Sequence, residues 1–145
     1  MKNNIKIRLV KNKKELEQVY KIREIVFIKE QKVAKNIEKD KFDETAKHFI
    51  FYYKNKPAGC ARIRLIGRNA KLERIAVLNW YRGKGFGKVI VDYLVKYCKR
   101  QKMKKIFMNA QYYLREYYKK LGFKPKGRIF DEAGIKHIKM DYTNK

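Results

Sequence analysis

The hydrophobic pattern of this chain changes its period just after the midpoint, and the change limits the folds open to it. Residues 48–53, 58–66 and 71–78 have the composition of strands, and short turns join them, as in an antiparallel meander. A glycine-rich turn follows, and apolar residues then recur at helical spacing from Phe86 to Cys98. The sequence therefore predicts a hairpin-connected sheet with a long amphipathic helix directly after it.

Shorter elements flank this centre on both sides. Alternating apolar residues predict a strand at 5–9, and Asn12 with Glu15 predicts the capped start of a helix that runs to about residue 30. Residues 32–46 are polar and irregular, and we expect a loop there. After the central helix we expect strand 106–108, helix 112–121, a strand from residue 123 and a strand at 135–140. This order predicts an α+β domain with a mixed, mostly antiparallel sheet.

The composition is that of one folded domain. The 145 residues are close to the roughly 150 expected of a domain, so we expect a single domain over residues 1–145. Hydrophobic residues make up 45% of the chain, which supports a core and excludes a disordered basic tail. No run approaches the roughly 20 apolar residues that cross a bilayer, and the N-terminus lacks a signal-peptide core. We therefore expect a soluble cytoplasmic protein without a membrane partner.

The chain is strongly basic. It has 39 Lys and Arg residues against 14 Asp and Glu residues, a formal net charge of +25. Such a field favours anionic partners, namely nucleic acid, a membrane surface or a phosphorylated cofactor. The positive residues are spread along the chain, whereas a concentrated arm or tail would favour nucleic acid more strongly. An A+T-rich coding bias would also produce this abundance of Lys, Asn, Ile and Tyr without any selected partner.

The cysteines indicate no metal site. Cys60 and Cys98 are the only two, and they lie far apart and outside any C-x-x-C pair. We expect both to be small buried thiols.

Three glycines within five residues mark the turn before the central helix. Gly83, Gly85 and Gly87 remove side chains where the chain turns, so bare N–H groups would point outward at a helix N-terminus. Neighbouring cations add positive charge there: Arg82, Lys84 and Lys88. The segment lacks the P-loop pattern G-x-x-x-x-G-K-[ST], and its glycine spacing does not fit a dinucleotide-binding fingerprint. The turn is therefore a candidate cradle for a phosphate or diphosphate.

The pattern Arg-x-x-Gly-x-Gly, at Arg82, Gly85 and Gly87, resembles the acyl-CoA motif of the GNAT superfamily of N-acetyltransferases. The run Leu72–Val77 before it is similar to the family's fourth strand, and the run Tyr117–Phe123 after it is similar to the family's FYxKxGF segment. Further segments are similar to an ElaA-like branch of the family: 26–31, 43–48, 109–111 and 132–140. The resemblance covers nearly the whole chain.

The resemblance implies the GNAT fold, an acyl-CoA N-acyltransferase fold in which the fourth and fifth strands of the sheet splay apart. Acetyl-CoA would lie in this opening, with its pantetheine arm paired to the backbone of the fourth strand. The amides of the turn would hold its diphosphate, and the fifth strand would contact it from the other side. The residues implied in cofactor binding are Ile75, Ala76, Val77, Arg82, Gly83, Lys84, Gly85, Phe86, Gly87, Lys88, Asn109 and Tyr118.

The implied reaction is direct acetyl transfer from the thioester to a primary amine of a small molecule or peptide. A lysine-like amine is neutral only about 1 time in 2,500 at pH 7, so a base is useful. Glu73, on the strand beside the thioester, is the first candidate for this base, and the Val77 N–H would stabilise the oxyanion. Tyr118 matches the family's general acid, which would protonate the leaving thiolate. We expect its neighbour Tyr117 to pack in the core.

Other polar residues are candidates for contacting the acceptor amine: Arg23, Glu30, Asp43, His48, Glu132 and His137. The last four of these, together with Glu44, are also weaker candidates for the base. The acids of the 32–46 loop would either attract a cationic amine or be ordinary solvated groups. Two other functions stay open, a basic nucleic-acid-binding module and an acetyl-CoA-binding regulatory protein without turnover. A homodimer also stays open.

Overall fold

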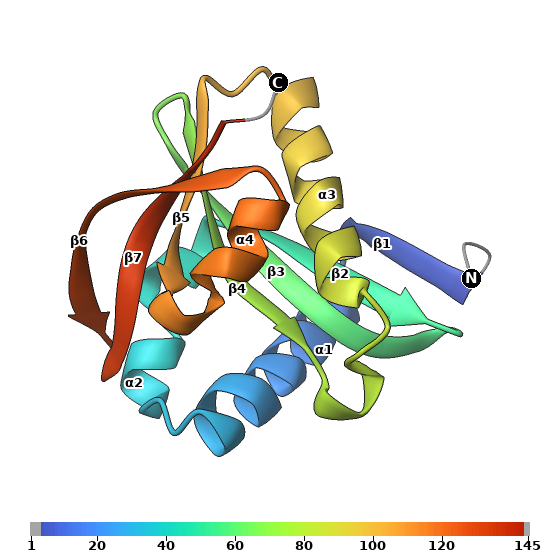
Figure 1. Ribbon diagram of the computed structural model, residues 1–145. Coiled ribbons are helices and arrows are strands. Elements are labelled where there is room, and N and C mark those ends of the chain that lie inside the picture. The colour runs from blue at the N-terminus through green and yellow to red at the C-terminus, as the bar shows by residue number, and fades with distance from the viewer. Residues whose placement is uncertain (1–3, 144–145) are drawn as a thin grey trace.

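A seven-stranded sheet forms the centre of the computed structural model, which describes residues 4–143 (Figure 1). In sheet order the strands are β1 (Ile5–Leu9), β2 (Lys47–Tyr53), β3 (Lys56–Ile66), β4 (Asn69–Val77), β5 (Lys105–Gln111), β7 (Ile135–Tyr142) and β6 (Phe123–Glu132). Neighbouring strands are antiparallel except β4 and β5, which run parallel. The predicted mixed sheet and α+β class are confirmed.

Helices connect the strands near the predicted places. The helix after β5 is shorter than the sequence predicts, and the segment before β2 is more regular. The main helices are α1 (Lys13–Arg23) with a π-helical extension at Glu24–Glu30, α3 (Phe86–Arg100) and α4 (Arg115–Lys120). The short segments are α2 (Lys35–Glu38) and the 3₁₀ turns at Lys41–Glu44, Asn79–Tyr81 and Tyr112–Leu114. The predicted loop 32–46 is thus partly helical, and the predicted helix 112–121 is a 3₁₀ turn followed by a short α-helix.

The start of α1 follows the sequence prediction only in part. The Asn12 side chain accepts a hydrogen bond from the Glu15 N–H at 2.9 Å, as predicted for an N-cap. The Glu15 carboxylate, however, accepts from the Lys11 N–H and from the Arg8 guanidinium. The Glu15 carboxylate therefore ties the start of α1 to β1 through an ion pair with Arg8.

The sheet buries an apolar layer on each face. Adjacent residues of β2 enter different layers: Phe49 and Phe51 join the larger cluster with α3, and Ile50 joins the smaller cluster with α1. Figure 1 shows α3 and α1 as the two long helices that flank the sheet. Cys60 and Cys98 are buried free thiols, as predicted, and burial raises the pKa of Cys98 to about 11.

A bulge divides β4 into two halves. The register against β3 shifts so that two residues of β4, Arg74 and Ile75, stand opposite the single residue Ala61. Arg74 has a left-handed backbone, with a φ of 54°. A bulge bends its strand and increases the local twist. The bulge therefore lies where β4 turns away from β5.

Candidate active site

The parallel strands β4 and β5 separate at their carboxyl ends. Their ladder ends at the pair Leu72–Met108, although β4 continues to Val77 and β5 continues to Gln111. Beyond that point β4 stays paired with β3, and β5 stays paired with β7. The facing edges of β4 and β5 therefore present backbone groups that a ligand carrying amides can pair.

The backbone of Val77 faces this opening. The Leu78 N–H donates to the Ala58 carbonyl at 2.9 Å, on the β3 side of the strand. In a strand, the N–H and C=O of one residue point to the same edge, and those of the next residue point to the opposite edge. The N–H and C=O of Val77 therefore point toward β5. The carbonyl accepts a hydrogen bond from Arg82 Nε at 2.9 Å, and the N–H is directed into the opening.

The glycine-rich turn lies at the N-terminus of α3. Gly83 and Gly85 have left-handed backbones, with φ of 82° and 80°, and no atom lies within 4 Å of where a Cβ would be at either position. Gly85 is the N-cap residue of α3 and supplies no side-chain cap, so the first amides of the helix lack acceptors within it. The turn thus has the open space, the amides and the helix dipole that bind an anion.

A cleft of about 550 Å³ fills the opening between the strands. The predicted site residues that line it are Glu73, Ile75, Ala76, Val77, Arg82, Asn109, Tyr118, Glu132 and His137. The remaining predicted cofactor residues, 83–88, continue from Arg82 into the start of α3. One cleft therefore connects the free edge of β4 with the hairpin of β6 and β7, and the glycine-rich turn follows directly after Arg82 in its wall.

Tyr118 of α4 lies in the wall of the cleft and is buried. Its ring packs edge to face on Tyr117 and on Phe123. Burial raises the pKa of its phenol, so the hydroxyl keeps its proton at neutral pH. Tyr118 is therefore able to donate a hydrogen bond or a proton to a group held in the cleft.

The prediction that Tyr117 packs in the core is wrong. Tyr117 is 39% exposed, and its hydroxyl lies over Gly87, where an added Cβ would come within 2.6 Å of the oxygen. The short helix α4 turns only the second of its two adjacent tyrosines inward. A side chain at position 87 would therefore have to displace the hydroxyl end of Tyr117.

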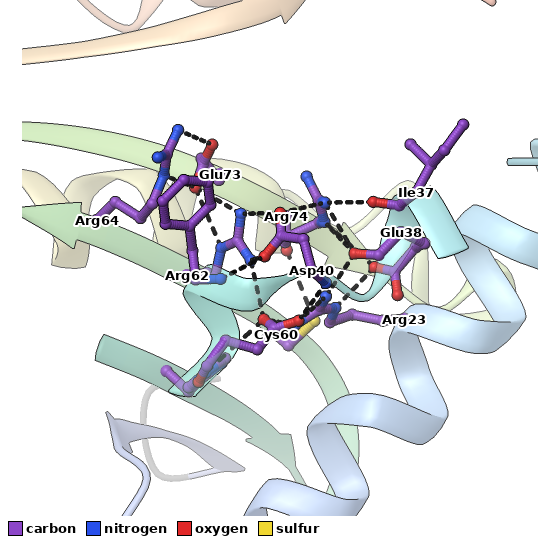
Figure 2. Close-up of polar contacts among 12 residues, drawn as sticks. Arg23, Ile37, Glu38, Asp40, Cys60, Arg62, Arg64, Glu73 and Arg74 are labelled. Atoms are coloured by element: carbon purple, nitrogen blue, oxygen red, sulfur yellow. Dashed lines mark hydrogen bonds and ion pairs between the residues drawn. The ribbon is translucent and has the colours of Figure 1, made fainter. Parts of the chain in front are cut away.

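The environment of Glu73 argues against its predicted role as the general base. Its carboxylate accepts hydrogen bonds from Arg62 and Arg64, as Figure 2 shows, and Lys71 Nζ lies 3.1 Å away. Burial alone would raise its pKa, but the hydrogen bonds and charges of these three cations lower it to about 2. Such a carboxylate is a weak proton acceptor at neutral pH. Glu73 instead holds β3 and β4 together.

A buried ion network organises the segment that the sequence predicted as a loop. Arg23 of α1 is 1% exposed and donates to Glu38 and Asp43, and Arg62 of β3 is equally buried and donates to Asp40 and Asp43. Figure 2 shows Arg23, Glu38, Asp40 and Arg62 meeting between α1, α2 and the strands. Arg23 and Asp43, predicted as acceptor contacts, are therefore structural partners of each other.

His48 and Glu30 also lie outside the lining of the cleft. His48 Nε2 lies 2.8 Å from the Asp43 carbonyl, and its ring borders a separate depression beside the start of α1. Burial lowers the pKa of His48, so its ring is neutral at pH 7. Glu30 pairs with Arg82 at 2.7 Å, next to the glycine-rich turn. Of the six predicted acceptor contacts, Glu132 and His137 are the two that line the cleft.

Glu132 ends β6, and His137 lies near the start of β7. His137 Nδ1 is 2.7 Å from the carbonyl oxygen of Ile135, and His137 Nε2 is 3.7 Å from Glu132 Oε2. Asn109 Nδ2 donates to Glu132 Oε1 at 3.4 Å, and Phe130 stacks on the imidazole ring. The hairpin thus places a carboxylate and an imidazole side by side in the wall of the cleft.

Two absences apply to the described part of the chain. Within residues 4–143, no three side chains of His, Cys, Asp or Glu are grouped so that they could hold a metal ion. In the same range, no helix has both the length and the apolar character that crossing a membrane requires.

Comparison with known proteins gives a family match over most of the chain. The family model described as "Acetyltransferase (GNAT) domain" matches residues 10–144. The Bacillus subtilis protein YyaT is 37% identical over 137 residues, which cover 92% of this chain and 93% of YyaT.

Solved structures share the fold. Escherichia coli ElaA aligns with a TM-score of 0.86 and 21% identity, over 96% of this chain and 99% of ElaA. A GNAT family acetyltransferase from Elizabethkingia anophelis, with acetyl-CoA bound, aligns with a TM-score of 0.70 and 17% identity, over 96% and 95% of the two chains. At these identities the likeness concerns the fold alone.

Proposed function

This chain belongs to the GNAT acetyltransferase family, and from that premise we propose that it transfers the acetyl group of acetyl-CoA directly to a primary amine. The family match confirms the resemblance seen in the sequence, and the fold, with its opening between β4 and β5, is the predicted one. One observation carries the proposal. The free edge of β4 and Arg82 line a single cleft, and the open glycine-rich turn at the start of α3 follows Arg82 directly.

The shape and chemistry of this cleft fit the parts of acetyl-CoA. The β4 edge offers amides and carbonyls to a pantetheine arm, and the turn offers amides and positive charge to a diphosphate. Asn109 faces the same space from β5. The Elizabethkingia anophelis neighbour with acetyl-CoA bound supports this assignment. The residues assigned to the cofactor are Ile75, Ala76, Val77, Arg82, Gly83, Lys84, Gly85, Phe86, Gly87, Lys88, Asn109 and Tyr118.

When bound, acetyl-CoA supplies an acetyl group activated as a thioester. We assign to the Val77 N–H, which is directed into the opening, the stabilisation of negative charge on the carbonyl oxygen. We assign to Tyr118 a hydrogen bond to the sulfur. With ordinary pKa values, proton transfer from a phenol to a thiolate costs roughly 2 kcal/mol. Burial makes the Tyr118 phenol less acidic still, which opposes full proton transfer, but the hydrogen bond strengthens because its acceptor, the sulfur, becomes negatively charged.

Binding of acetyl-CoA to the full chain tests the assigned cradle. Titration calorimetry is expected to detect binding, and Gly85→Ala is expected to weaken it by about tenfold or more, since the methyl group occupies the space assigned to the diphosphate. Gly67→Ala is the matched control, because Gly67 also has a left-handed φ of 61° and open space but lies in the turn between β3 and β4. Equal weakening by both variants, or no binding by the wild type, contradicts the cradle.

Release of CoA with a panel of amines tests the transfer step. Acetylation of any member supports the enzyme. Acetyl-CoA binding without acetylation of any amine favours a regulatory protein. Tight nucleic-acid binding with a steep salt dependence, unaffected by acetyl-CoA, favours a basic binding module.

A further inference from the structure

We propose that the acceptor is a primary monoamine with an uncharged, largely apolar body, whose nitrogen binds between Glu132 and His137 and loses its proton to His137. The inference rests on the proposed acetyl transfer and deepens it by naming the acceptor class. It also supplies a base from the β6–β7 hairpin in place of Glu73, whose carboxylate is held by three cations.

The hydrogen bonds of His137 determine which ring nitrogen accepts a proton. The carbonyl oxygen of Ile135, 2.7 Å from Nδ1, can only accept a hydrogen bond, so Nδ1 carries the hydrogen of the neutral ring. The lone pair is then on Nε2, which is the nitrogen near Glu132. When Nε2 takes a proton, the carboxylate of Glu132 at 3.7 Å stabilises the resulting imidazolium. This pair is suited to removing a proton from an ammonium group.

Among the described residues that line the cleft, Glu132 is the one carboxylate that no Lys or Arg pairs. The other acids that line the cleft are each paired with arginine: Glu38 with Arg23 and Arg74, Asp40 with Arg62 and Arg74, and Glu73 with Arg62 and Arg64. Among residues 4–143, no Lys or Arg lies within 4 Å of Glu132, whose polar partners are Asn109 and His137. The cleft therefore has a position for one ammonium group but none for the second ammonium of a polyamine.

The cations that line the cleft are likewise paired with carboxylates. Their partners are Glu73 for Arg64 and Lys71, Glu38 and Asp40 for Arg74, and Glu30 for Arg82. The carboxylate of an amino-acid acceptor would have to break one of these pairs and leave an acid without its partner, which is costly in a partly buried site. The body of the acceptor is therefore expected to carry no charge.

An apolar wall also lines the cleft. It comes from the π-helical extension of α1 and from the segment up to α2, and its members are Val26, Phe27, Val33 and Ile37. Ile37 is 50% exposed, although it is a large apolar side chain. In Figure 1, α2 lies at the same end of the molecule as the ends of β6 and β7, and both parts line the cleft. An alkyl or aryl body would bury apolar surface against this wall.

The overall charge favours the same class of acceptor. The field of a chain with a net charge of +25 disfavours each positive charge that a substrate brings in. A monoamine brings one positive charge and a polyamine brings several. The same field favours the neutral form of the amine, which is the form that attacks.

The proposed step conserves atoms and charge. His137 Nε2 takes one proton from the ammonium, and the nitrogen lone pair then forms the N–C bond of the amide. The C–S bond breaks, and its electron pair goes to sulfur. The sulfur gains a proton from the hydroxyl of Tyr118, and the second proton of the nitrogen, lost as the amide forms, passes through solvent to Tyr118 and restores that hydroxyl. One proton is released overall, from His137 to solvent.

Three amines with the same six-carbon chain test the acceptor class: hexylamine, 1,6-diaminohexane and 6-aminohexanoate. With acetyl-CoA at saturation, kcat/KM for hexylamine is expected to exceed that for either analogue by about tenfold or more. If the diamine or the amino acid reacts as well as hexylamine, this inference is overturned, while the proposed acetyl transfer stands. If acetyl-CoA binds but no amine of these three or of a broad panel reacts, the acetyl transfer itself is overturned.

Two neighbouring carboxylates of the hairpin test the ammonium position. Glu132→Gln is expected to raise KM for hexylamine about tenfold, since a charge-assisted hydrogen bond is lost, and to leave acetyl-CoA binding unchanged. Asp131→Asn is the matched control, because Asp131 is exposed and does not line the cleft. Equal KM values for the two variants overturn the assignment of Glu132.

His137→Gln distinguishes a base from a structural residue. The kcat/KM of this variant for hexylamine is expected to fall about 100-fold at pH 7. It is expected to recover as the pH approaches the pKa of the amine, because solvent then removes the proton and the amine is neutral without the base. Among residues 4–143, Glu132 is the charged group within 4 Å of the ring; the other titratable groups that line the cleft are Glu38, Asp40, Arg64, Lys71, Glu73, Arg74, Arg82, Tyr113 and Tyr118. The wild type, measured over the same range, corrects for their titration. A loss that persists at high pH overturns the role as base.

Discussion

Arg82 and Glu30 form a two-pronged ion pair, with Nη2 at 2.7 Å from Oε1 and Nη1 at 3.1 Å from Oε2. The same guanidinium donates through Nε to the Val77 carbonyl at 2.9 Å. Arg82 precedes the glycine-rich turn, and Glu30 ends the π-helical extension of α1. The pair therefore joins the segment assigned to the diphosphate to the segment that forms the apolar wall of the acceptor site.

Glu30→Gln is expected to tighten acetyl-CoA binding about threefold at low salt, because Arg82 then faces the phosphates without a competing carboxylate. Both side chains are partly exposed, so the effect should shrink at high salt. Calorimetry at two salt concentrations measures it, with Glu17→Gln as a control for removing an exposed negative charge from α1. Weaker binding by Glu30→Gln would show that the pair holds the turn in its binding conformation.

Tyr118→Phe is expected to lower kcat about 100-fold and to change acetyl-CoA affinity little, since it removes the proton donor but keeps the buried ring. Steady-state kinetics and calorimetry separate these two quantities. Tyr97→Phe is the control, because Tyr97 packs on Phe49 and does not line the cleft. An unchanged kcat in Tyr118→Phe would remove this hydroxyl from the mechanism.

The parts of the site that depend on local pattern could be predicted from the sequence. The run of aromatic and β-branched residues in 48–53 predicts a strand, and the spacing of the glycines in 83–87 predicts an open turn before a helix. Local pattern does not distinguish Tyr117 from Tyr118. Adjacent helical residues lie about 100° apart, and α4 is too short for its own periodicity to show which of them faces inward.

The buried charges could not be predicted, because their partners are distant in the sequence. Arg23 and Asp43 are 20 positions apart, and Arg62 meets Glu73 only when β3 pairs with β4. Taken singly, each charge is expected at the surface. The bulge at Arg74 could not be predicted either, because no local sequence pattern indicates that a non-glycine residue adopts a φ of 54°.

Arg62→Met is expected to lower the free energy of unfolding by roughly 3–5 kcal/mol, since it leaves the acids around Arg62 without their buried partner. Urea denaturation measures the change. Arg68→Met is the control, because Arg68 is exposed in the turn between β3 and β4 and should cost less than about 0.5 kcal/mol. Similar midpoints for both variants would mean that the ion network does not support the fold.

Glu73 gives the stability of the fold a dependence on acid pH. Burial opposes ionisation, but hydrogen bonds and charges from its cationic partners lower the pKa of Glu73 from 4.5 to about 2. Because the folded pKa lies below the unfolded one, the stabilisation is present above pH 4.5 and is lost as the pH falls toward about 2. Asp43, whose pKa is also lowered, acts in the same direction. Urea denaturation across this range should therefore show a smaller loss of stability for Glu73→Gln than for the wild type, even though the variant is less stable at pH 7. Parallel losses in the two proteins would mean that the ionised form of Glu73 adds nothing to the fold.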